Sequence, residues 1–424
     1  MNPQALTSSL IFILVYALII ADLLPRSITT LSGAVLLFIL GIIKDTQVVS
    51  LINWEAMGLI LGMFILVRIL VESGFFDFLG SYVVKFSKGK PSIIFIGLAV
   101  VTGVLAAFMD SITVMLFMAS LSIQIAKQLD ANPVPFVLSQ VAASNLGGSA
   151  TLMGNPPNII LGTGLGISLE QYVIYLAPLA IILLFLNAYL FYFVNKNEFA
   201  KAKKLSESYV MSIKPFEHIK DSYMFYSGIF SFLLTVLFLI IHDKIGISVG
   251  HVGIIGATIG LILNARQLGN IWEKIDWEVI VFFATLFIII GALEVTGVIQ
   301  SIANLIIIFA KGSSFITKNI LLWTSSILSA FIDNVPFAAS MVPLIRSLAG
   351  KVPVTVISMA LITTFGTDVG GSMTPIGASP NVVGLSILKN AGIEVSWGEY
   401  IKRVAPITLL EIIISDLVFI LLYH

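Results

Sequence analysis

The chain contains no cysteine, and its four histidines are scattered among 424 residues. Without cysteine there is no disulfide bond, thiolate nucleophile or thiolate metal site, and scattered histidines argue against a histidine metal centre. Charged residues make up 11 % of the sequence, against roughly 25 % in soluble domains. The net charge is zero, which leaves no electrostatic basis for binding nucleic acid.

Motifs for nucleotide-driven transport and for catalysis are missing as well. No G-x-x-x-x-G-K-[ST] phosphate loop occurs, which excludes ATP binding through a Walker motif. No catalytic or metal-ligand constellation is present either. We therefore expect neither an enzyme nor a bound cofactor or metal, and the simplest interpretation is transport driven by a gradient of H⁺ or Na⁺.

Apolar residues dominate what the sequence does contain. They make up 58 % of the chain, and apolar runs of about 17–25 residues, long enough to cross a bilayer as helices, recur along it. The first run, Leu10 to Ile20, follows no basic residue and precedes no small-residue cleavage site, so we expect a membrane span rather than a signal peptide. The sequence predicts an all-α polytopic membrane protein.

The sequence repeats itself at a constant offset of 223 residues. Trp54-Glu55 corresponds to Trp277-Glu278, and the match continues without a gap from Gly33 to Asn158. Self-similarity over such a length indicates an internal duplication. We predict a first repeat at 1–195, a lysine-rich cytoplasmic linker at 196–222 and a second repeat at 223–424.

The apolar pattern also predicts a topology. If the run 91–128 is a re-entrant hairpin, each repeat crosses the membrane five times, and an odd number makes the two repeats inverted. Basic residues are more frequent on the side of the linker, which places that side in the cytoplasm and both termini outside. We expect a plasma (inner) membrane protein with re-entrant hairpins and discontinuous helices.

Two similar polar loops interrupt apolar segments, "SNLGGSATLMGNPPN" from Ser144 to Asn158 and "TDVGGSMTPIGASPN" from Thr367 to Asn381. Irregular backbone is not tolerated against lipid, so both loops must face protein or a water-filled cavity. Inverted repeats with broken helices at the midplane are typical of secondary transporters. The helix after Gly154 is expected to point free N–H groups at an anion, and the helix before Gly147 to offer carbonyls to a cation.

The loop residues that we predict to bind substrate or ions are small or carry neutral oxygen and amide groups, with one carboxylate. They are Asn145, Gly147, Gly148, Ser149, Thr151, Gly154, Asn155 and Asn158 in the first loop, and Thr367, Asp368, Gly370, Gly371, Ser372, Thr374, Gly377, Ser379 and Asn381 in the second.

Two carboxylates lie at the centres of apolar runs, Asp110 in "FMDSITVM" and Asp333 in "FIDNVPFA". A carboxylate at the bilayer centre costs on the order of 2.5–3.5 kcal/mol on insertion scales, so it normally faces a polar site. Each Asp also precedes a helix and is a good N-cap residue. We predict that both cap their helices while facing a cavity as proton or cation sites, with Ser111 and Asn334 as polar neighbours.

These motifs resemble those of the ion transporter superfamily (citrate-transporter-like). "AFMDS" at 107–111, "NLGG" at 145–148 and "GNPPN" at 154–158 are similar to the first half of its group of arsenite permeases, P proteins and sodium–proton antiporters. "FIDNVP" at 331–336 and "GASPN" at 377–381 resemble the second half. Ser111 departs from that pattern, where Asn usually follows the Asp.

The resemblance implies inverted repeats whose hairpin tips and broken helices form the substrate and ion site. It also implies a homodimer with an elevator-type movement, and it permits a cytoplasmic ATPase subunit on the linker. Members carry arsenite, citrate or other carboxylates, or exchange sodium for protons, so the motifs leave the substrate open.

The two acidic tips argue against a dianionic carboxylate and favour a neutral or cationic substrate. Our first expectation is a permease that exports arsenite or antimonite in exchange for protons and holds As(OH)₃ through hydroxyl and amide groups. A Na⁺/H⁺ antiporter with Asp110 and Asp333 as competing sites is the second. A Na⁺-coupled transporter of a small anion or carboxylate and a channel are further alternatives.

Overall fold

The fold is entirely helical over the residues that the computed structural model describes, 3–21, 23–267, 269 and 271–422, and no strand occurs in these ranges. Six helices are long and apolar enough to cross a membrane: α1 (Pro3–Ala21), α4 (Trp54–Ser73), α11 (Ala177–Val194), α14 (Ser222–Ile245), α16 (Trp277–Val295) and α22 (Trp397–Leu422).

Shorter helices complete the two predicted repeats. The first also contains α2 (Arg26–Ile39), α3 (Asp45–Leu51), α5 (Phe75–Phe86), α6 (Pro91–Ala106), α7 (Ser111–Gln128), α8 (Pro133–Gly148), α9 (Pro156–Leu165) and α10 (Leu169–Tyr175). The second also contains α15 (Val249–Leu263), η2 (Ile271–Lys274), α17 (Val298–Ala310), α18 (Ser314–Phe331), α19 (Asn334–Leu348), α20 (Val356–Gly371) and α21 (Ser379–Asn390).

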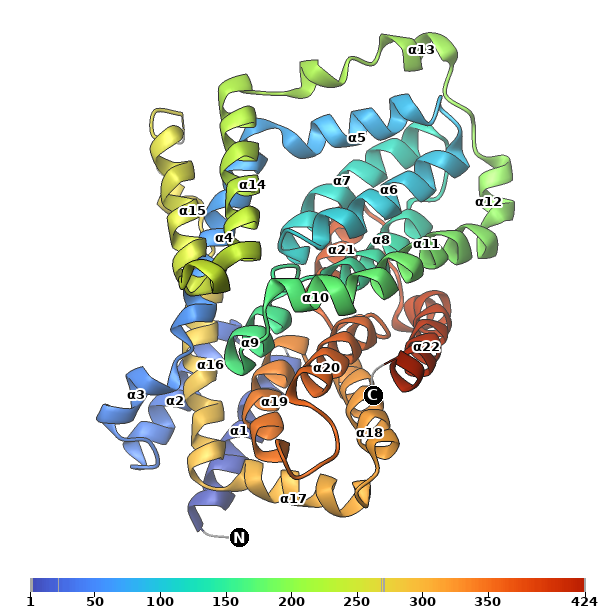
Figure 1. Ribbon diagram of the computed structural model, residues 1–424. Coiled ribbons are helices and arrows are strands. Elements are labelled where there is room, and N and C mark those ends of the chain that lie inside the picture. The colour runs from blue at the N-terminus through green and yellow to red at the C-terminus, as the bar shows by residue number, and fades with distance from the viewer. Residues whose placement is uncertain (1–2, 22, 268, 270, 423–424) are drawn as a thin grey trace.

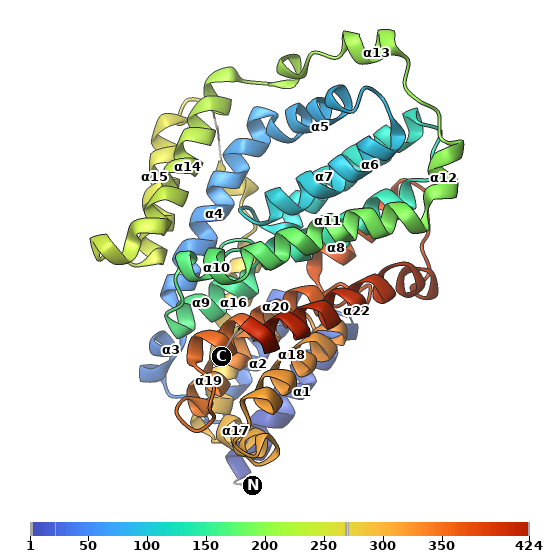
Figure 2. The same ribbon diagram turned by 45° about the vertical axis from the view of Figure 1, so that its right-hand side comes forward.

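The linker contains three short helices, α12 (Lys196–Lys201), α13 (Glu207–Ser212) and η1 (Pro215–His218). It runs over one end of the molecule from α11 to α14, whereas the N-terminus lies at the opposite end (Figures 1 and 2). Of these three helices only α12 contains lysine, and the other lysines of the linker lie in the segments between the helices.

The expected breaks in the apolar segments are present. The run 91–128 forms α6 and α7 with a turn between them, and the first quoted loop separates α8 from α9. The second loop separates α20 from α21 in the same way. Pro156 and Pro157 begin α9, where a helix can accept proline because the first N–H groups have no intrahelical partner.

Matching hydrogen bonds shape the two broken helices. The hydroxyl of Thr151 donates to the carbonyl of Ala107, and that of Thr374 donates to the carbonyl of Ala330. Asn158 Nδ2 donates to the carbonyls of Gly148 and Thr151, both at 2.7 Å. Asn381 Nδ2 donates to the carbonyls of Gly371 and Thr374 at 2.8 and 2.7 Å. Each of the three hydrogen bonds in the first broken helix thus has a counterpart in the second at the 223-residue offset.

Small residues let the helices of each repeat approach closely. A Cβ atom on Gly147 of α8 would collide with the carbonyl of Gly103 in α6, and one on Gly370 of α20 would collide with the backbone of Ser326 in α18. Such contacts are typical of membrane helices, because lipid gives no hydrophobic drive for helix association and close packing must supply it.

The two repeats interlock around their broken helices. Helix α9 of the first repeat packs against α19 and α20 of the second, and α21 of the second packs against α7 and α8 of the first. Both ribbon views show α9 near α20, and Figure 1 shows α21 beside α8. This exchange brings both quoted loops to the centre of the molecule.

Candidate functional site

Both predicted hairpin-tip carboxylates cap the helices that follow them. Asp110 Oδ2 accepts from the backbone N–H and the hydroxyl of Thr113 at 3.0 and 3.1 Å. Asp333 Oδ1 accepts from the backbone N–H of Val335 at 3.0 Å. Both residues are buried. Each carboxylate therefore accepts hydrogen bonds at the start of its helix through one oxygen, and its second oxygen is left for other partners.

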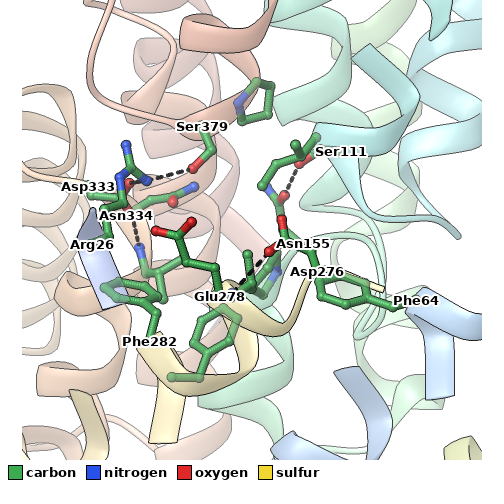
Figure 3. Close-up of a pocket in the computed structure, with 16 residues that line it drawn as sticks. Arg26, Phe64, Ser111, Asn155, Asp276, Glu278, Phe282, Asp333, Asn334 and Ser379 are labelled. Carbon is green, nitrogen blue, oxygen red and sulfur yellow. Dashed lines mark hydrogen bonds and ion pairs between the residues drawn. The ribbon is translucent and has the colours of Figure 1, made fainter. Parts of the chain in front are cut away.

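A cavity with about 610 Å³ of free space, part of it open to solvent, lies between the two hairpin tips (Figure 3). Ser111 and Asn155 line it from the first repeat, and Asp333, Asn334 and Ser379 line it from the second. The hydroxyl of Ser111 donates to Asn155 Oδ1. The structure thus brings five of the predicted site residues into one cavity.

Arg26 is a cavity residue that the sequence reasoning missed. Its Nη1 lies 2.6 Å from Asp333 Oδ2 and donates to Ser379 Oγ at 3.1 Å. Its counterpart at the 223-residue offset is Val249, so the duplication gives no sign of its role. The sequence did contain one sign of its role, because Arg26 is a single basic side chain between two apolar runs.

Two further acidic residues face the same cavity. Asp276 is the N-cap of α16, Glu278 lies in its first turn, and both line the cavity together with Phe282 (Figure 3). Because Arg26 is already paired with Asp333, the lining carries a net negative charge.

Asp110 faces a neighbouring cavity rather than the same one. Arg68, Thr113 and Lys274 also line that second cavity. The two cavities share Phe64, Ile112, Asp276 and Val279 as walls. The two tip carboxylates therefore open onto adjoining spaces separated by the start of α16.

A third cavity repeats the second at the 223-residue offset. It is lined by Asn53, Phe287 and Ala339, whose counterparts are Asp276, Phe64 and Leu116 of the second cavity. Arg346 closes part of it by donating from Nη2 to the carbonyl of Gly164 at 2.5 Å. The duplication has thus produced two related cavities, one at the start of α4 and one at the start of α16.

Most of the predicted loop residues are buried between helices instead of lining the central cavity. Ser149 and Thr367 donate to carbonyls one turn earlier in their own helices, at 2.7 and 2.6 Å. The buried predicted residues outside the central cavity lining are Asn145, Gly147, Gly148, Ser149, Thr151, Gly154, Asn158, Thr367, Asp368, Gly370, Gly371, Ser372, Thr374, Gly377 and Asn381.

Side chains of the two loops bind one another across the repeats. Asn145 Nδ2 donates to Ser372 Oγ at 2.9 Å and to Asn381 Oδ1 at 3.0 Å. Asn155 Nδ2 donates to Asp368 Oδ1 at 3.0 Å. These buried contacts join α8 to the second loop and α20 to the first.

The expectation that the first turn of α9 points free N–H groups at an anion is wrong. Pro156 and Pro157 carry no N–H, and the N–H of Asn158 donates to the carbonyl of Asn155 at 3.0 Å. The helix start keeps its dipole but offers an anion few donors. Side chains must therefore provide most of the polar contacts of a substrate in the central cavity.

Comparison with known proteins agrees with this architecture. The model of a family described as citrate transporter matches residues 16–366. The chain belongs to the citrate transporter family. It is 31 % identical over 416 residues to a 46 kDa membrane protein of Mycobacterium leprae, covering 96 % of each chain. It is 25 % identical to the mouse P protein, covering 97 % of this chain and 59 % of that protein.

A solved structure shares the fold. Neisseria gonorrhoeae MtrF, described as one of a class of antimetabolite efflux pumps, superposes with a TM-score of 0.59 at 13 % identity, covering 89 % of this chain and 83 % of that one. Family and relatives together identify this chain as a multi-pass secondary transporter of the ion transporter type, and not as an enzyme.

Proposed function

We propose that this transporter exports a small neutral hydroxylated solute, with arsenite or antimonite as the first candidates, in exchange for protons. The observation that carries this proposal is the composition of the central cavity. Hydroxyl and amide groups of Ser111, Asn155, Asn334 and Ser379 line it, and its one arginine is already paired with Asp333. Such groups suit As(OH)₃, which offers hydroxyls for hydrogen bonds and needs no counter-charge.

The charge of the cavity disfavours a citrate-like substrate, although the family is named for citrate. Binding a carboxylate dianion would require free cations, whereas Asp276 and Glu278 add negative charge to the lining. Like charges facing one another cost free energy, most of all where water is scarce. A carboxylate would also compete with Asp333 for Arg26.

Na⁺/H⁺ antiport is the second candidate, and the acidic groups favour it. Asp110, Asp276, Glu278 and Asp333 surround the two adjoining cavities. Carboxylate and carbonyl oxygens are suitable ligands for Na⁺, and a carboxylate can exchange a cation for a proton.

The related cavities at the starts of α4 and α16 support a mechanism of alternating access. In inverted-repeat transporters, one repeat moves against the other around a site at their interface. We propose that movement of the hairpin and broken-helix elements closes one cavity and opens its counterpart. The proposal retains the domain division at the linker and a plasma-membrane homodimer; an ATPase subunit is not required for exchange with protons.

Proton flux from liposomes tests the proposal. The purified full chain is reconstituted with a pH-sensitive dye inside and an acidic lumen, and arsenite, Na⁺ or citrate is added outside. Alkalinisation of the lumen with arsenite supports the first candidate, and alkalinisation with Na⁺ alone replaces it by the second. A response to citrate alone overturns both. Empty liposomes and Asp333→Asn protein are the controls.

A further inference from the structure

Asn145 and Asp368 occupy equivalent positions in α8 and α20, yet one is an amide and the other an acid. The amide of Asn145 reaches across to the second repeat and donates to Asn381 Oδ1. The carboxyl of Asp368 reaches across to the first repeat, accepts from Asn155 Nδ2 and lies beside the side chain of Asn158. Asn158 is the counterpart of Asn381.

By the 223-residue offset, Asn158 Oδ1 corresponds to the oxygen of Asn381 that accepts from Asn145, so this oxygen is the one expected to face Asp368. Asn158 Nδ2 is held by the carbonyls of Gly148 and Thr151, and these bonds would be lost if the amide were flipped. Asn381 has the same orientation in the second repeat, and there its oxygen accepts from Asn145. At the first-repeat position, the neighbour that should donate is a carboxyl.

Two oxygens are consequently without a donor. Asp368 Oδ2 and Asn158 Oδ1 make no hydrogen bond to any residue that the structure describes, and both side chains are fully buried. Buried polar atoms are normally satisfied, and an ionised oxygen without a donor is the most costly exception. One proton on Asp368 Oδ2 would satisfy both atoms at once, because it would supply the donor that Asn145 supplies in the other repeat.

We propose that Asp368 carries the coupling proton of this transporter and holds it on Oδ2 in a hydrogen bond to Asn158 Oδ1. The assignment rests on the proposed proton coupling and moves the coupling site from the hairpin tips to the crossing of the broken helices. Release of the proton leaves a carboxylate that keeps only the donation from Asn155. It also leaves two acceptors facing each other between the repeats, which weakens that contact and favours relative movement of the repeats.

The helices around Asp368 leave it without a charged partner among the described residues. Helices α8 and α9 contain no charged residue. Tyr172 of α10 is a titratable side chain near Asp368, and its hydroxyl donates to the carbonyl of Asn158 and shares a hydrogen bond with the hydroxyl of Thr364. The charged residues of the other helices packed on α20 are Lys318 on α18, Arg346 on α19, and Glu399, Lys402, Arg403, Glu411 and Asp416 on α22.

Most of these charges have other partners. Asp333, which caps α19, pairs with Arg26, and Arg346 binds the carbonyl of Gly164. Arg403 pairs with Glu399, and Asp416 accepts from Trp323. The proton on Asp368 is therefore held by a neutral amide, which allows it to leave without breaking an ion pair.

Infrared spectroscopy of the purified full chain tests the assignment without a substrate. We expect a C=O stretching band of a protonated carboxyl at neutral pH that is absent in Asp368→Asn. The Asn side chain reproduces the donor of Asn145, so this variant should fold. Asn158→Ala should shift the band because the hydrogen bond is lost. Its repeat counterpart Asn381→Ala is the matched control and should leave the band in place.

Three outcomes overturn the assignment. The first is a difference spectrum between wild type and Asp368→Asn that contains no carboxyl band, and the second is an equal shift of the Asp368 band in Asn158→Ala and Asn381→Ala. The third is loss of the band when Na⁺ is added at constant pH, which would make this a sodium site. In liposomes, Asp368→Asn should reduce solute-driven proton flux to the level of empty vesicles, and full flux would exclude a coupling role. If wild-type protein moves no protons with any solute, the proposed function fails, while the spectra still decide whether Asp368 holds a proton.

Discussion

Among single residues, Arg26 has the largest influence on the charge of the central cavity, because it is the basic residue of the lining. It neutralises Asp333, whose side chain is 4 % exposed, and it donates a hydrogen bond to Ser379 of the second repeat. Removing one partner of a buried pair costs more than the pair contributes, because the remaining charge stays desolvated. The Arg26 side chain is 33 % exposed, which lets water screen part of the effect.

We expect Arg26→Met to destabilise the protein by about 2 kcal/mol, because Asp333 keeps only its bond to the N–H of Val335. The measurement is the thermal unfolding midpoint of the purified protein in detergent. The double variant Arg26→Met/Asp333→Asn removes both charges and should recover most of the loss. If the double variant is no more stable than Arg26→Met, the ion pair is not the source of the effect.

Among the helices, glycine contacts control how closely the broken helices pack against their neighbours. Helix α8 crosses α6 at Gly147 and Gly103, and α20 crosses α18 at Gly370 and Ser326. In each case backbone meets backbone, so the neighbour cannot move aside as a flexible side chain would. The crossing therefore sets the position of the loop that follows each helix.

Gly147→Ala should destabilise the protein by about 1–3 kcal/mol through overpacking against Gly103. Gly398→Ala is the matched control, because nothing lies within 4 Å of an added Cβ there and the residue is in the first turn of α22. It should be neutral or stabilise by about 0.4–1 kcal/mol. Thermal unfolding measures both; equal midpoints for the two variants would contradict the role of the crossing.

For the molecule as a whole, the main question is how the two repeats are oriented in the membrane. Matching hydrogen bonds and cavities show that the repeats share local structure, whereas the inverted orientation remains a prediction from charge and crossing number. Because the chain has no cysteine, single cysteines can be introduced without altering the background.

We expect Lys204→Cys in the linker to react with a membrane-impermeant maleimide only after permeabilisation. Lys44→Cys and Lys351→Cys, in exposed turns of the first and second repeats, should react in intact cells. The positive-inside rule is the physical reason, since lysine-rich segments stay in the cytoplasm. Labelling of Lys204→Cys and Lys351→Cys from the same side would contradict the predicted topology.

Much of the fold could be predicted from local sequence. Apolar runs reveal spanning helices because the bilayer sets their length, and Gly and Pro mark the breaks because they alter the backbone directly. Asp110 and Asp333 could be recognised as caps, since a cap bonds within three residues of itself. The candidate site was less predictable: many loop residues chosen from their chemistry are buried between helices, and Arg26 was missed.

The sequence by itself determined the helices, their breaks, the duplication and the family, because hydropathy, backbone chemistry and self-similarity are properties of short segments or of their spacing. Only the tertiary structure decided which side chains meet. Arg26 and Asp333 are 307 residues apart, and Asp368 reaches Asn155 across 213 residues. Contacts over such separations depend on how the repeats interlock, and this interlocking decides which acid is paired and which has an oxygen without a donor.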